Sequence, residues 1–464
     1  MHKEDFPDSI YSPVFIRDFV PASLFARKFV NEARLQSKAS PLLIGTARPD
    51  RSVNHFETIV CTDSPEWFER SKLYIERTIK FLLWSYGASD LYIGGAPEIA
   101  DYIKTVYGQE GPRKFDVNFM THIYGRPFNV ISCSIDDIPE QNLNVQSVGH
   151  HFDGCRVGFD LGASDVKVSA VIDGEAIFST EMEWFPKDQQ DPSYHKDFIR
   201  NAIQLAVSKL PRLDAIGGSA AGVYINNQPR IASLFRGVPE DKYEQIHQLF
   251  DQLADEFNVP MVVINDGEVT ALAGSISLED NGIMGLALGS SEAIGYINPE
   301  GKITGYLNEL AFAPIDVSPQ APIDEWSGDR GVGASYLSQQ AVFRLAKAVG
   351  ISIPDDLSPA GQLEHMQEHL ESGHPGAEKI WKNIGLFLGY AIAHYATFYD
   401  FKHVLILGRV TSGSGGSILL DNAVEVFHKD FPELAQRVKL QLPDEKSRRV
   451  GQAIAAASLP IIER

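Results

Sequence analysis

Two aspartates stand at the ends of apolar, strand-like runs, where a carboxylate can take part in catalysis. Asp160 lies near the end of the run from Arg156 to Leu161, and Asp266 follows the run from Pro260 to Asn265. A carboxylate at the carboxyl end of a strand faces the crevice of an α/β lobe. Asp266 could accept the proton of a hydroxyl that attacks a γ-phosphate, and Asp160 could hold Mg²⁺ directly or through water. The alternatives are that Asp266 only caps a helix and that Asp160 only begins a hairpin.

Three glycine-containing turns could bind the phosphates of a nucleotide. Each follows a strand-like run, and glycine lets the backbone turn sharply and approach a phosphate. Backbone amides and serine hydroxyls in such turns can donate hydrogen bonds to phosphate oxygens. The third turn suits the adenosine and α-phosphate side of a nucleotide, but it matches neither a P-loop nor G-x-G-x-x-G, and an ordinary loop is the alternative for each turn. The candidate residues are Gly162, Ser164 and Lys167 in the first turn, Gly289, Ser290 and Ser291 in the second, and Gly408 and Arg409 in the third.

The elements that must position these residues fall into three predicted domains. The polar sequence from His150 to Gly154 is turn-forming, and a new strand pattern follows it, so we place a boundary there. Residues 1–150 are predicted to form an N-terminal α/β domain, whose role the sequence does not reveal. A first lobe covers residues 155–280 and a second lobe covers residues 281–445. A C-terminal helix over residues 446–462 is expected to pack back on the first lobe.

The two lobes share one predicted outline. Strand-like runs separated by turns are followed by alternating helices and strands, and the Asp173–Gly174 pair in the first lobe favours a hairpin. A second copy of the outline begins near Ile283. Two such lobes would hold a ligand in the cleft between them. The predicted fold class is therefore α/β, with two ribonuclease-H-like, actin-like ATPase lobes, an interlobe cleft and an additional N-terminal α/β domain.

The bulk composition argues against several classes of protein. The chain has 464 residues with 61 acidic and 41 basic side chains, and its formal charge of -20 repels nucleic acid and anionic membranes. Its three cysteines, Cys61, Cys133 and Cys155, are widely spaced, which argues against a disulfide framework or structural zinc and suits a reducing cytoplasm. The first residues show no secretory signal. The apolar stretch from Ile384 to Tyr399 is short and contains His394, so we expect a buried helix and no membrane span.

In their order along the chain, these motifs resemble the ROK family of sugar kinases and repressors, within the actin and hexokinase superfamily. The resemblance covers nearly all of residues 155–464 and is closest from Val259 to Ala273. It implies that Asp266 is the general base and that the loop from Gly217 to Gly222 borders the sugar. The substrate-binding residues that the resemblance indicates are Asn265, Glu309, Gly222 and Glu268.

The sequence departs from the family pattern at several motif positions. The first turn has Ala163 in place of a second glycine and Ser164 in place of threonine, and serines replace the Thr-Gly of the second turn. In the third turn Arg409 replaces a glycine and would crowd the adenine base or stack on it. The zinc-binding histidine of the family falls at Phe312, and its cysteine cluster is absent around residues 326–335. We therefore predict no zinc, and a zinc-free sugar site could be shaped differently.

The leading hypothesis is an ATP-dependent carbohydrate kinase that phosphorylates a hydroxyl of a hexose or an amino sugar, with ATP and Mg²⁺ as cofactors. The altered glycine turns support an alternative, a non-catalytic sensor that binds sugar or nucleotide. A third reading, a transcriptional repressor, needs an N-terminal winged helix, whereas residues 1–150 have an α/β pattern. The expected partners are a small-molecule sugar and ATP, with no nucleic acid and no membrane. A homodimer is compatible with the sequence.

Overall fold

The computed structural model describes residues 19–143, 149–443 and 451–462. Internal contacts divide these residues into two compact units. Unit 1 contains residues 19–143, 286–294 and 305–442. Unit 2 contains residues 149–285, 295–304, 443 and 451–462.

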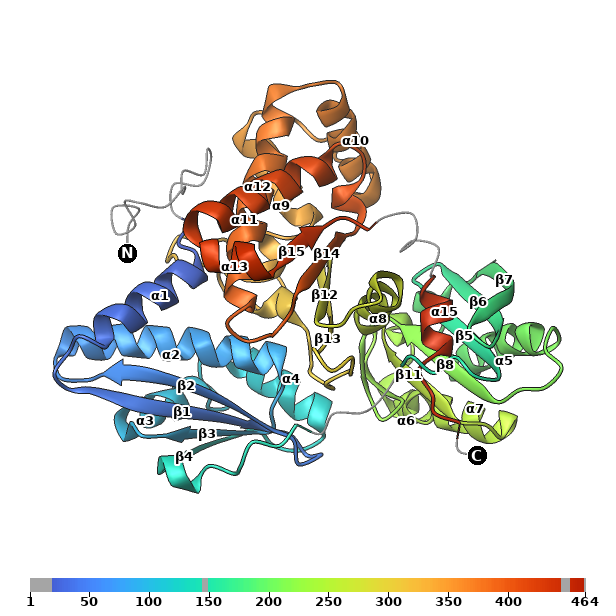
Figure 1. Cartoon of the computed structure of the whole chain (residues 1–464), viewed down its shortest axis with the longest axis horizontal. Coiled ribbons are helices and arrows are strands. Elements are labelled where there is room, and N and C mark those ends of the chain that lie inside the picture. Colours follow the sequence, from blue (N-terminus) through green and yellow to red (C-terminus); the bar gives the residue numbers. More distant parts are fainter. Residues whose placement is uncertain (1–18, 144–148, 444–450, 463–464) are drawn as a thin grey trace. The chain divides into compact units, whose positions relative to one another are not determined.

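A four-stranded sheet forms the centre of the N-terminal part of unit 1 (Figure 1). Its strand order is β2-β1-β3-β4, with β1 antiparallel to β2 and β3, and with β3 parallel to β4. The strands are β1 (Ala39–Ala47), β2 (Val53–Cys61), β3 (Asp90–Gly94) and β4 (Asn129–Cys133). The helices of this part are α1 (Ala22–Ala33), α2 (Pro65–Ser85), α3 (Pro97–Val106) and α4 (Lys114–Tyr124).

Helix α2 is the longest element of this part and is buried over most of its length. The Ser64 hydroxyl caps its first turn by accepting a hydrogen bond from the Trp67 amide at 3.2 Å, and Pro65 occupies the first helical position. Among the buried side chains of α2 are three charged ones, Glu76, Arg77 and Lys80. Buried charges need partners. Glu76 and Arg77 pair with each other, and their further partners lie just before α4 and in the loop that follows residue 312, while the partner of Lys80 lies on α4.

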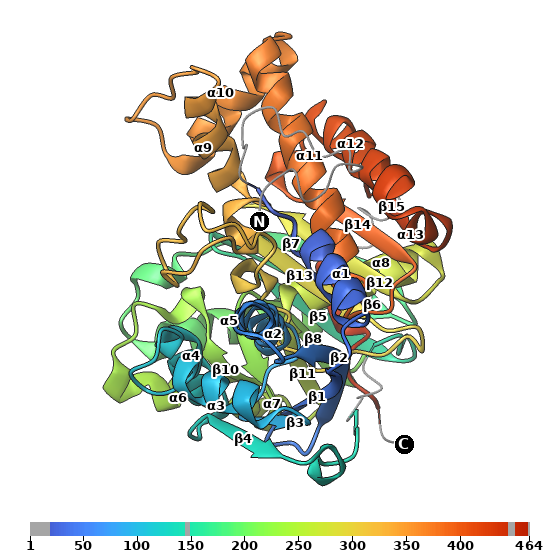
Figure 2. The ribbon, with the colours of Figure 1, turned by 90° about the vertical axis from the view of Figure 1, so that its left-hand side faces the viewer.

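The N-terminal domain shares a core with the second-lobe residues of unit 1. Helix α1 lies beside α11 (Pro375–Tyr395) (Figure 2). Just before α1, the ring centroid of Phe19 lies 4.8 Å from that of Phe387 on α11. Phe81 on α2 stacks on Phe398 at 4.1 Å. Such aromatic pairs bury large apolar areas. From the sequence we predict a separate domain over residues 1–150. In the structure, the described residues of the N-terminal range form one compact unit with residues 305–442.

The second sheet has the order β13-β12-β14-β15, and β14 is parallel to β15. Its strands are β12 (Ile283–Leu288), β13 (Glu292–Ile297), β14 (His403–Leu407) and β15 (Lys439–Gln441). Besides α11, the helices of this part are α9 (Gln339–Ala348), α10 (Pro359–Glu371), α12 (Gly415–Asp430) and α13 (Pro432–Arg437). Helices α11 and α12 pack together closely, because glycines of α11 meet the α12 backbone where a side chain would collide with it.

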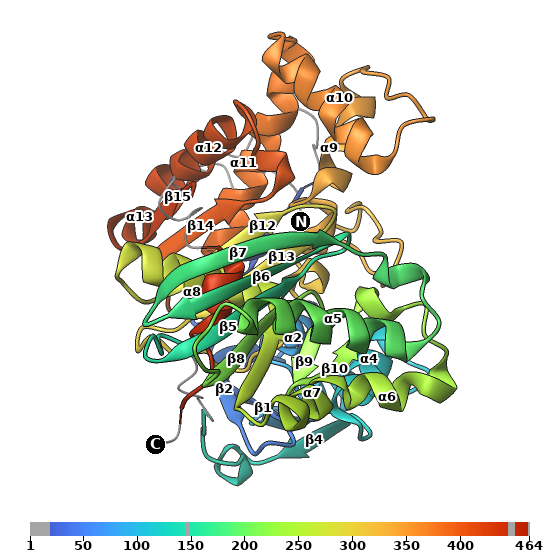
Figure 3. The same cartoon turned by 90° about the vertical axis from the view of Figure 1, so that its right-hand side faces the viewer.

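Unit 2 is built on a five-stranded sheet of order β11-β8-β5-β6-β7 (Figure 3). Strands β5, β6 and β7 are antiparallel neighbours, and β5, β8 and β11 are parallel, which is the ribonuclease-H-like order. The strands are β5 (Cys155–Leu161), β6 (Asp165–Ile172), β7 (Glu175–Glu183), β8 (Ala215–Ala220) and β11 (Met261–Asn265), with a small hairpin of β9 (Val223–Ile225) and β10 (Gln228–Ile231). The helices are α5 (Pro192–Val207), α6 (Tyr243–His247), α7 (Leu249–Phe257), α8 (Asp266–Leu278) and α15 (Gln452–Ala457).

Helix α15 lies on the unit 2 sheet through its alanines. A Cβ added at Gly158 on β5 would lie 1.6 Å from the carbonyl oxygen of Ala453, and one at Gly217 on β8 would lie 1.7 Å from that of Ala456. These two glycines therefore make room for the helix backbone. Residues 446–450, where we expected this helix to begin, lie outside the described residues. Within the described residues, no helix is both long and apolar enough to cross a membrane.

Candidate active site

The two candidate aspartates lie at one edge of the unit 2 sheet. In the parallel strands, Asp160 on β5 pairs with Ser219 on β8, and Ser219 pairs with Ile264 on β11. Asn265 ends β11 and Asp266 begins α8. The carboxyl ends of the strands therefore bring both carboxylates to the same edge, where α/β folds bind their ligands.

Asp160 is almost fully buried and is held by one neighbouring side chain. The Ser219 hydroxyl donates a hydrogen bond of 2.6 Å to its Oδ1 atom. Burial raises the pKa of Asp160 to about 6; the Ser219 bond opposes this rise, and the Asp266 carboxylate adds to it. Among the described residues, no hydrogen bond occupies the second oxygen, Oδ2. This oxygen is a suitable ligand for Mg²⁺, which usually takes one or two protein carboxylates together with substrate phosphates and water.

The backbone around Asp266 is fixed, while its side chain stays partly exposed. Its carbonyl oxygen accepts a hydrogen bond from the Thr270 hydroxyl at 2.8 Å and a longer one from the Gln452 amide at 3.4 Å. Burial raises the pKa of the Asp266 carboxyl, and a hydrogen bond from the Gly267 amide opposes the rise. A carboxylate with a raised pKa is a stronger general base.

Asn265 ties the end of β11 to the loop after β8. Its Nδ2 donates to the Gly222 carbonyl oxygen at 2.8 Å, and its Oδ1 accepts from the Gly267 amide at 2.7 Å. Gly222 has φ +123, and a Cβ there would lie 2.4 Å from the Ile231 carbonyl oxygen, so this position requires glycine. One hydrogen of the Asn265 amide is therefore left for a substrate oxygen.

The remaining unit 2 candidates differ in exposure. Glu268 is buried in the first turn of α8, where a carboxylate is favoured by the helix dipole. The turn after β5 is shaped by two hydrogen bonds: the Gly162 amide donates to Asp165 at 2.9 Å, and the Trp184 indole donates to Gly162 at 2.8 Å. Ser164 is exposed in this turn. Lys167 lies on β6 with its Nζ 3.5 Å from a carboxylate oxygen of Asp165.

In unit 1, the second and third turns lie together. The Gly289 amide donates to the Ser291 carbonyl oxygen at 3.0 Å, which closes the turn between β12 and β13. Gly408 follows β14 with φ +100, and a Cβ there would lie 2.4 Å from the Leu288 carbonyl oxygen. Gly408 thus packs directly against the backbone that enters the Gly289 turn. These two turns therefore form one candidate nucleotide site within unit 1.

The side chains around this unit 1 site point to solvent. Ser290, Ser291 and Arg409 are all exposed. The Arg409 carbonyl oxygen accepts a hydrogen bond from Gln367 at 2.7 Å, which fixes the backbone after Gly408. An exposed guanidinium at this position can stack on an adenine ring.

The N-terminal domain holds the backbone of Glu309. The amides of Asn308 and Glu309 donate to the carbonyl oxygens of Ser85 and Trp84, at 3.0 and 2.9 Å, at the end of α2. These carbonyl groups have no partner within the helix, so the loop completes its C-terminus. The Tyr399 hydroxyl also donates to the Asn308 side chain at 2.9 Å. Sequence reasoning missed this link because the two segments are more than 200 residues apart.

Phe312, where the zinc histidine of the resembling family falls, lies in an aromatic cluster. Its ring centroid is 4.5 Å from that of Trp84, and the rings of Phe115 and Phe119 are also in contact. In the part of the chain that the structure describes, no three His, Cys, Asp or Glu side chains are grouped to hold a metal ion. An apolar aromatic cluster offers no zinc ligand.

The structure also brings forward residues that the sequence did not single out. Ser219 bonds Asp160, and Gln452 donates a 2.7 Å hydrogen bond to Thr270 beside Asp266. Ser219 is the only polar residue in the glycine- and alanine-rich run before Gly222. That isolated hydroxyl could have indicated a hydrogen bond to a site residue such as Asp160. Gln452 is far from Asp266 in sequence and carries no local signal.

No protein-family model and no curated protein matches the sequence. Among solved structures, the chain is similar to a ROK family transcriptional regulator, a homolog of the E. coli MLC protein, with 17% identity and a TM-score of 0.52 over 66% of this chain and 79% of that one. It is also similar to a ROK hexokinase from Thermus thermophilus, with 16% identity and a TM-score of 0.50 over 65% of this chain and 97% of that one. These likenesses confirm the predicted fold class, a mixed α/β protein with actin-like lobes.

Proposed function

We propose that the chain is a divergent member of the ROK family and an ATP-dependent kinase of a hexose or amino sugar. One observation carries the proposal: Asp160 and Asp266 stand at the same edge of a ribonuclease-H-like sheet, at the ends of parallel strands. A phosphotransferase needs one carboxylate for the metal and one for the attacking hydroxyl. The fold shared with a ROK hexokinase supports the same assignment.

In this proposal Asp266 is the general base. It accepts the proton of a sugar hydroxyl as the hydroxyl oxygen attacks the γ-phosphorus of ATP. The bond from that phosphorus to the β,γ-bridging oxygen breaks, and ADP and a sugar phosphate are formed. The amide of Asn265, fixed by Gly222, orients the sugar, and the raised pKa of Asp266 favours proton transfer.

The nucleotide is assigned to the glycine turns. Amides near Gly162 and Gly289 would donate to phosphate oxygens, and Gly408 with Arg409 would border the adenosine. Asp160 would hold Mg²⁺ through its Oδ2 atom, and the ion would neutralise charge on the phosphates. Glu309, on the backbone held by α2, is assigned to sugar hydroxyls.

The alternative is a non-catalytic sugar or nucleotide sensor. The observation that favours it is the pair of altered turns, with Ala163 in the first and the exposed Arg409 in the third. A sensor would keep the binding surfaces while losing the close approach of backbone to phosphate on which transfer depends.

One experiment distinguishes the sugar kinase from the non-catalytic sensor. Wild-type protein is screened by thermal shift against hexoses and N-acetylated hexosamines, with and without Mg–AMPPNP, and the sugars that bind are tested for ADP release in a coupled assay. A kinase gives sugar-dependent ADP release with at least one binding sugar. Binding of sugar and nucleotide with no ADP release, at any pH from 6 to 9, would establish the sensor instead.

A further inference from the structure

The loop segment of residues 308–331 contains Glu309, the residue assigned above to sugar hydroxyls. Apart from the short 3₁₀ turn η6 (Leu310–Phe312), the described backbone of this segment forms neither a helix nor a strand of a sheet. Such a segment has few hydrogen bonds of its own, so its position depends on the elements that contact it. The contacts that hold the segment therefore determine where Glu309 lies.

One end of the segment is held by the last turns of α2. The Glu309 amide donates a hydrogen bond of 2.9 Å to the Trp84 carbonyl oxygen, and the Trp84 ring packs on Phe312 at 4.5 Å between ring centroids. The indole N–H of Trp84 donates to Asp116 at 2.9 Å, and the same carboxylate lies 2.7 Å from the buried Lys80. Because the indole is fixed in this way, α2 sets both the backbone and the aromatic packing at this end.

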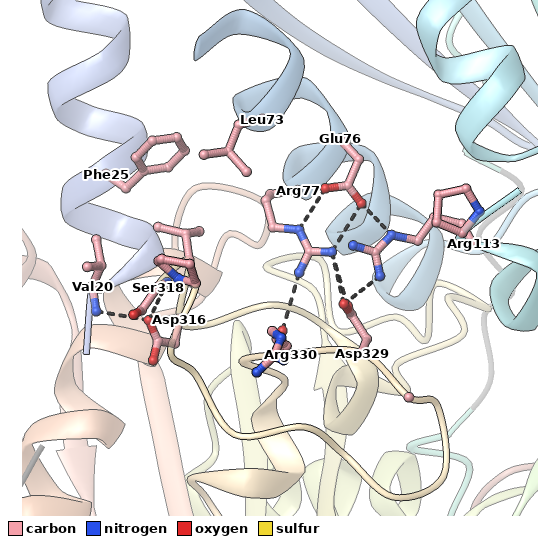
Figure 4. Close-up of a pocket in the computed structure, with 14 residues that line it drawn as sticks. Val20, Phe25, Leu73, Glu76, Arg77, Arg113, Asp316, Ser318, Asp329 and Arg330 are labelled. Atoms are coloured by element: carbon pink, nitrogen blue, oxygen red, sulfur yellow. Dashed lines mark hydrogen bonds and ion pairs between the residues drawn. The ribbon is translucent and has the colours of Figure 1, made fainter. Parts of the chain in front are cut away.

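The other end is held by a ring of buried charges, which forms part of the wall of a pocket in unit 1 (Figure 4). The Asp329 carboxylate accepts hydrogen bonds from Arg77 on α2 at 3.0 and 3.3 Å, and Nη1 of Arg113 contacts the same carboxylate. Glu76 completes the ring by bonding both arginines. Arg77 also donates to the Arg330 carbonyl oxygen at 3.3 Å. The N-terminal domain thus holds a side chain and the neighbouring backbone of the segment.

The contacts of Asp329 are strong because they are removed from water. Asp329 is only 8% exposed, and Lys80 lies 3.4 Å from its carboxylate as a third cation. Separating a buried carboxylate from its cations carries a large electrostatic cost. The turn before it is closed as well, since the Asp324 amide donates to the Asp329 carbonyl oxygen at 2.8 Å. Asp329 is therefore a fixed point of the segment.

Both ends of the segment are held by the same face of α2. Arg77 and Trp84 are about two turns apart, or about 10 Å along the helix axis, and residues at this spacing share a face. Helix α2 is buried over most of its length. It is therefore a rigid base that fixes the spacing between the two ends.

Backbone pairing connects the two ends within the segment. The Ile315 amide donates to the Gly331 carbonyl oxygen at 2.8 Å, and just beyond the segment the Gly333 amide donates to the Ala313 carbonyl oxygen at 3.0 Å. The turn η6 then joins this pairing to the end that Trp84 holds. A shift at the charged ring is therefore transmitted through the pairing to the backbone of the sugar-binding carboxylate.

We propose that α2 of the N-terminal domain is a positioning element of the sugar site, with Trp84 and Asp329 as positioning residues. Neither side chain needs to touch the sugar. Together they hold Glu309 where it accepts hydrogen bonds from sugar hydroxyls, so the N-terminal domain contributes to sugar affinity. This inference rests on the proposed function, because that function assigns Glu309 to the sugar.

The test measures sugar and nucleotide separately in full-length Asp329→Asn, with a sugar that the wild-type protein phosphorylates. The variant keeps the size of the side chain and removes the charge that holds Arg77 and Arg113. A displaced Glu309 weakens sugar binding equally in the ground and transition states. We therefore expect the KM for sugar to rise about tenfold or more, with kcat and the Kd of Mg–AMPPNP unchanged. An unchanged KM for sugar, or an equal loss of nucleotide affinity, would overturn the inference.

Asp430→Asn is the matched control, because Asp430 is also an 8% exposed carboxylate of unit 1 and is bonded to Tyr390 on α11. It should leave the KM for sugar at the wild-type value, and an equal rise in both variants would overturn the inference by showing general destabilisation. Phe312→Leu removes the aromatic contact with Trp84 without changing a charge, and it should also raise the KM for sugar. If circular dichroism shows that Asp329→Asn does not fold, Phe312→Leu decides the test, and an unchanged KM there is contrary to the inference.

Hydrogen exchange, followed by mass spectrometry, distinguishes a failure of this inference from a failure of the kinase proposal. In Asp329→Asn, the amides of residues 308–312 should exchange faster than in wild type, although they are distant from the substitution in sequence, and in Asp430→Asn they should not. Faster exchange in a protein that binds no sugar would overturn the assignment of Glu309 to a sugar. Unchanged exchange would overturn the positioning role, whether or not a sugar binds.

Discussion

Glu292 offers a quantitative test of the packing around the Gly289 turn, the candidate phosphate-binding turn of unit 1. It begins β13 directly after Ser291 and is only 4% exposed. Its Oε1 accepts a hydrogen bond from the Tyr395 hydroxyl at 2.7 Å, and within the described residues its Oε2 has no partner. Burial raises the pKa of Glu292 from 4.5 to about 8. At pH 7 the folded protein therefore keeps this carboxyl group protonated.

The perturbation is Glu292→Gln, which keeps the shape and cannot ionise. Between pH 4.5 and about 8 the folded state binds a proton that the unfolded state has lost, so wild-type stability falls as pH rises through this window. At about 1.4 kcal/mol per pKa unit, the variant gains about 3 kcal/mol over wild type by pH 7 and about 5 kcal/mol above pH 8. Any loss from an unpaired amide adds a constant that does not depend on pH.

The assay is urea unfolding of both proteins at pH 5, 6, 7, 8 and 9, followed by circular dichroism. The difference in unfolding free energy between Glu292→Gln and wild type should rise with pH and level off above pH 8. Glu364→Gln serves as the control, because Glu364 is an exposed glutamate of the same unit. A difference that stays constant from pH 5 to pH 9 would refute the reasoning.

Three further predictions concern other parts of the chain. Lys80→Met should destabilise the protein by about 3–5 kcal/mol in urea unfolding, because it leaves the buried carboxylate of Asp116 without its cation; Lys80→Met with Asp116→Asn should recover part of the loss. Gly222→Ala should cost about 1–3 kcal/mol and lower sugar affinity, whereas Gly373→Ala, at a positive φ with open space around it, should affect thermal stability less and sugar affinity not at all. Activity that depends on Mg²⁺ should fall below pH 6, since burial raises the pKa of Asp160 to about 6 and only the ionised carboxylate binds the metal; a profile flat to pH 5 would argue against Asp160 as the ligand.

Much of the unit 2 fold could be predicted because its signals are local. The Asp173–Gly174 pair does form the turn between β6 and β7, with φ values of 48 and 85 that these residue types tolerate. The ends of β5 and β11 could be placed from their apolar runs. The parallel register that sets Asp160 and Asp266 on one edge follows from the ribonuclease-H-like order.

Other features depend on contacts that no local pattern shows. Helix α4 was not predicted, because it begins after Arg113 without a side-chain cap. Helices α6 and α7 are separated at Gln248, where no glycine or proline marks the break.

The place of the N-terminal domain could not be predicted either. Its polar boundary near His150 suggested independence, whereas its aromatic side chains pack on residues more than 200 positions away. Charged residues in a helical pattern usually lie on the solvated face, so the sequence of α2 does not indicate that Glu76, Arg77 and Lys80 are buried. Only their partners on α4 and in the loop of residues 316–330 show that they are core groups.

The most direct test of the central claim is the turnover of Asp266→Ala on a sugar that the wild-type protein phosphorylates. The account predicts that sugar-dependent ADP release is abolished while Mg–AMPPNP affinity is kept, because Asp266 acts only on the sugar hydroxyl. Asp255→Ala, which removes an exposed carboxylate of unit 2, should match wild type in both measurements. Full sugar-dependent ADP release by Asp266→Ala would contradict the account.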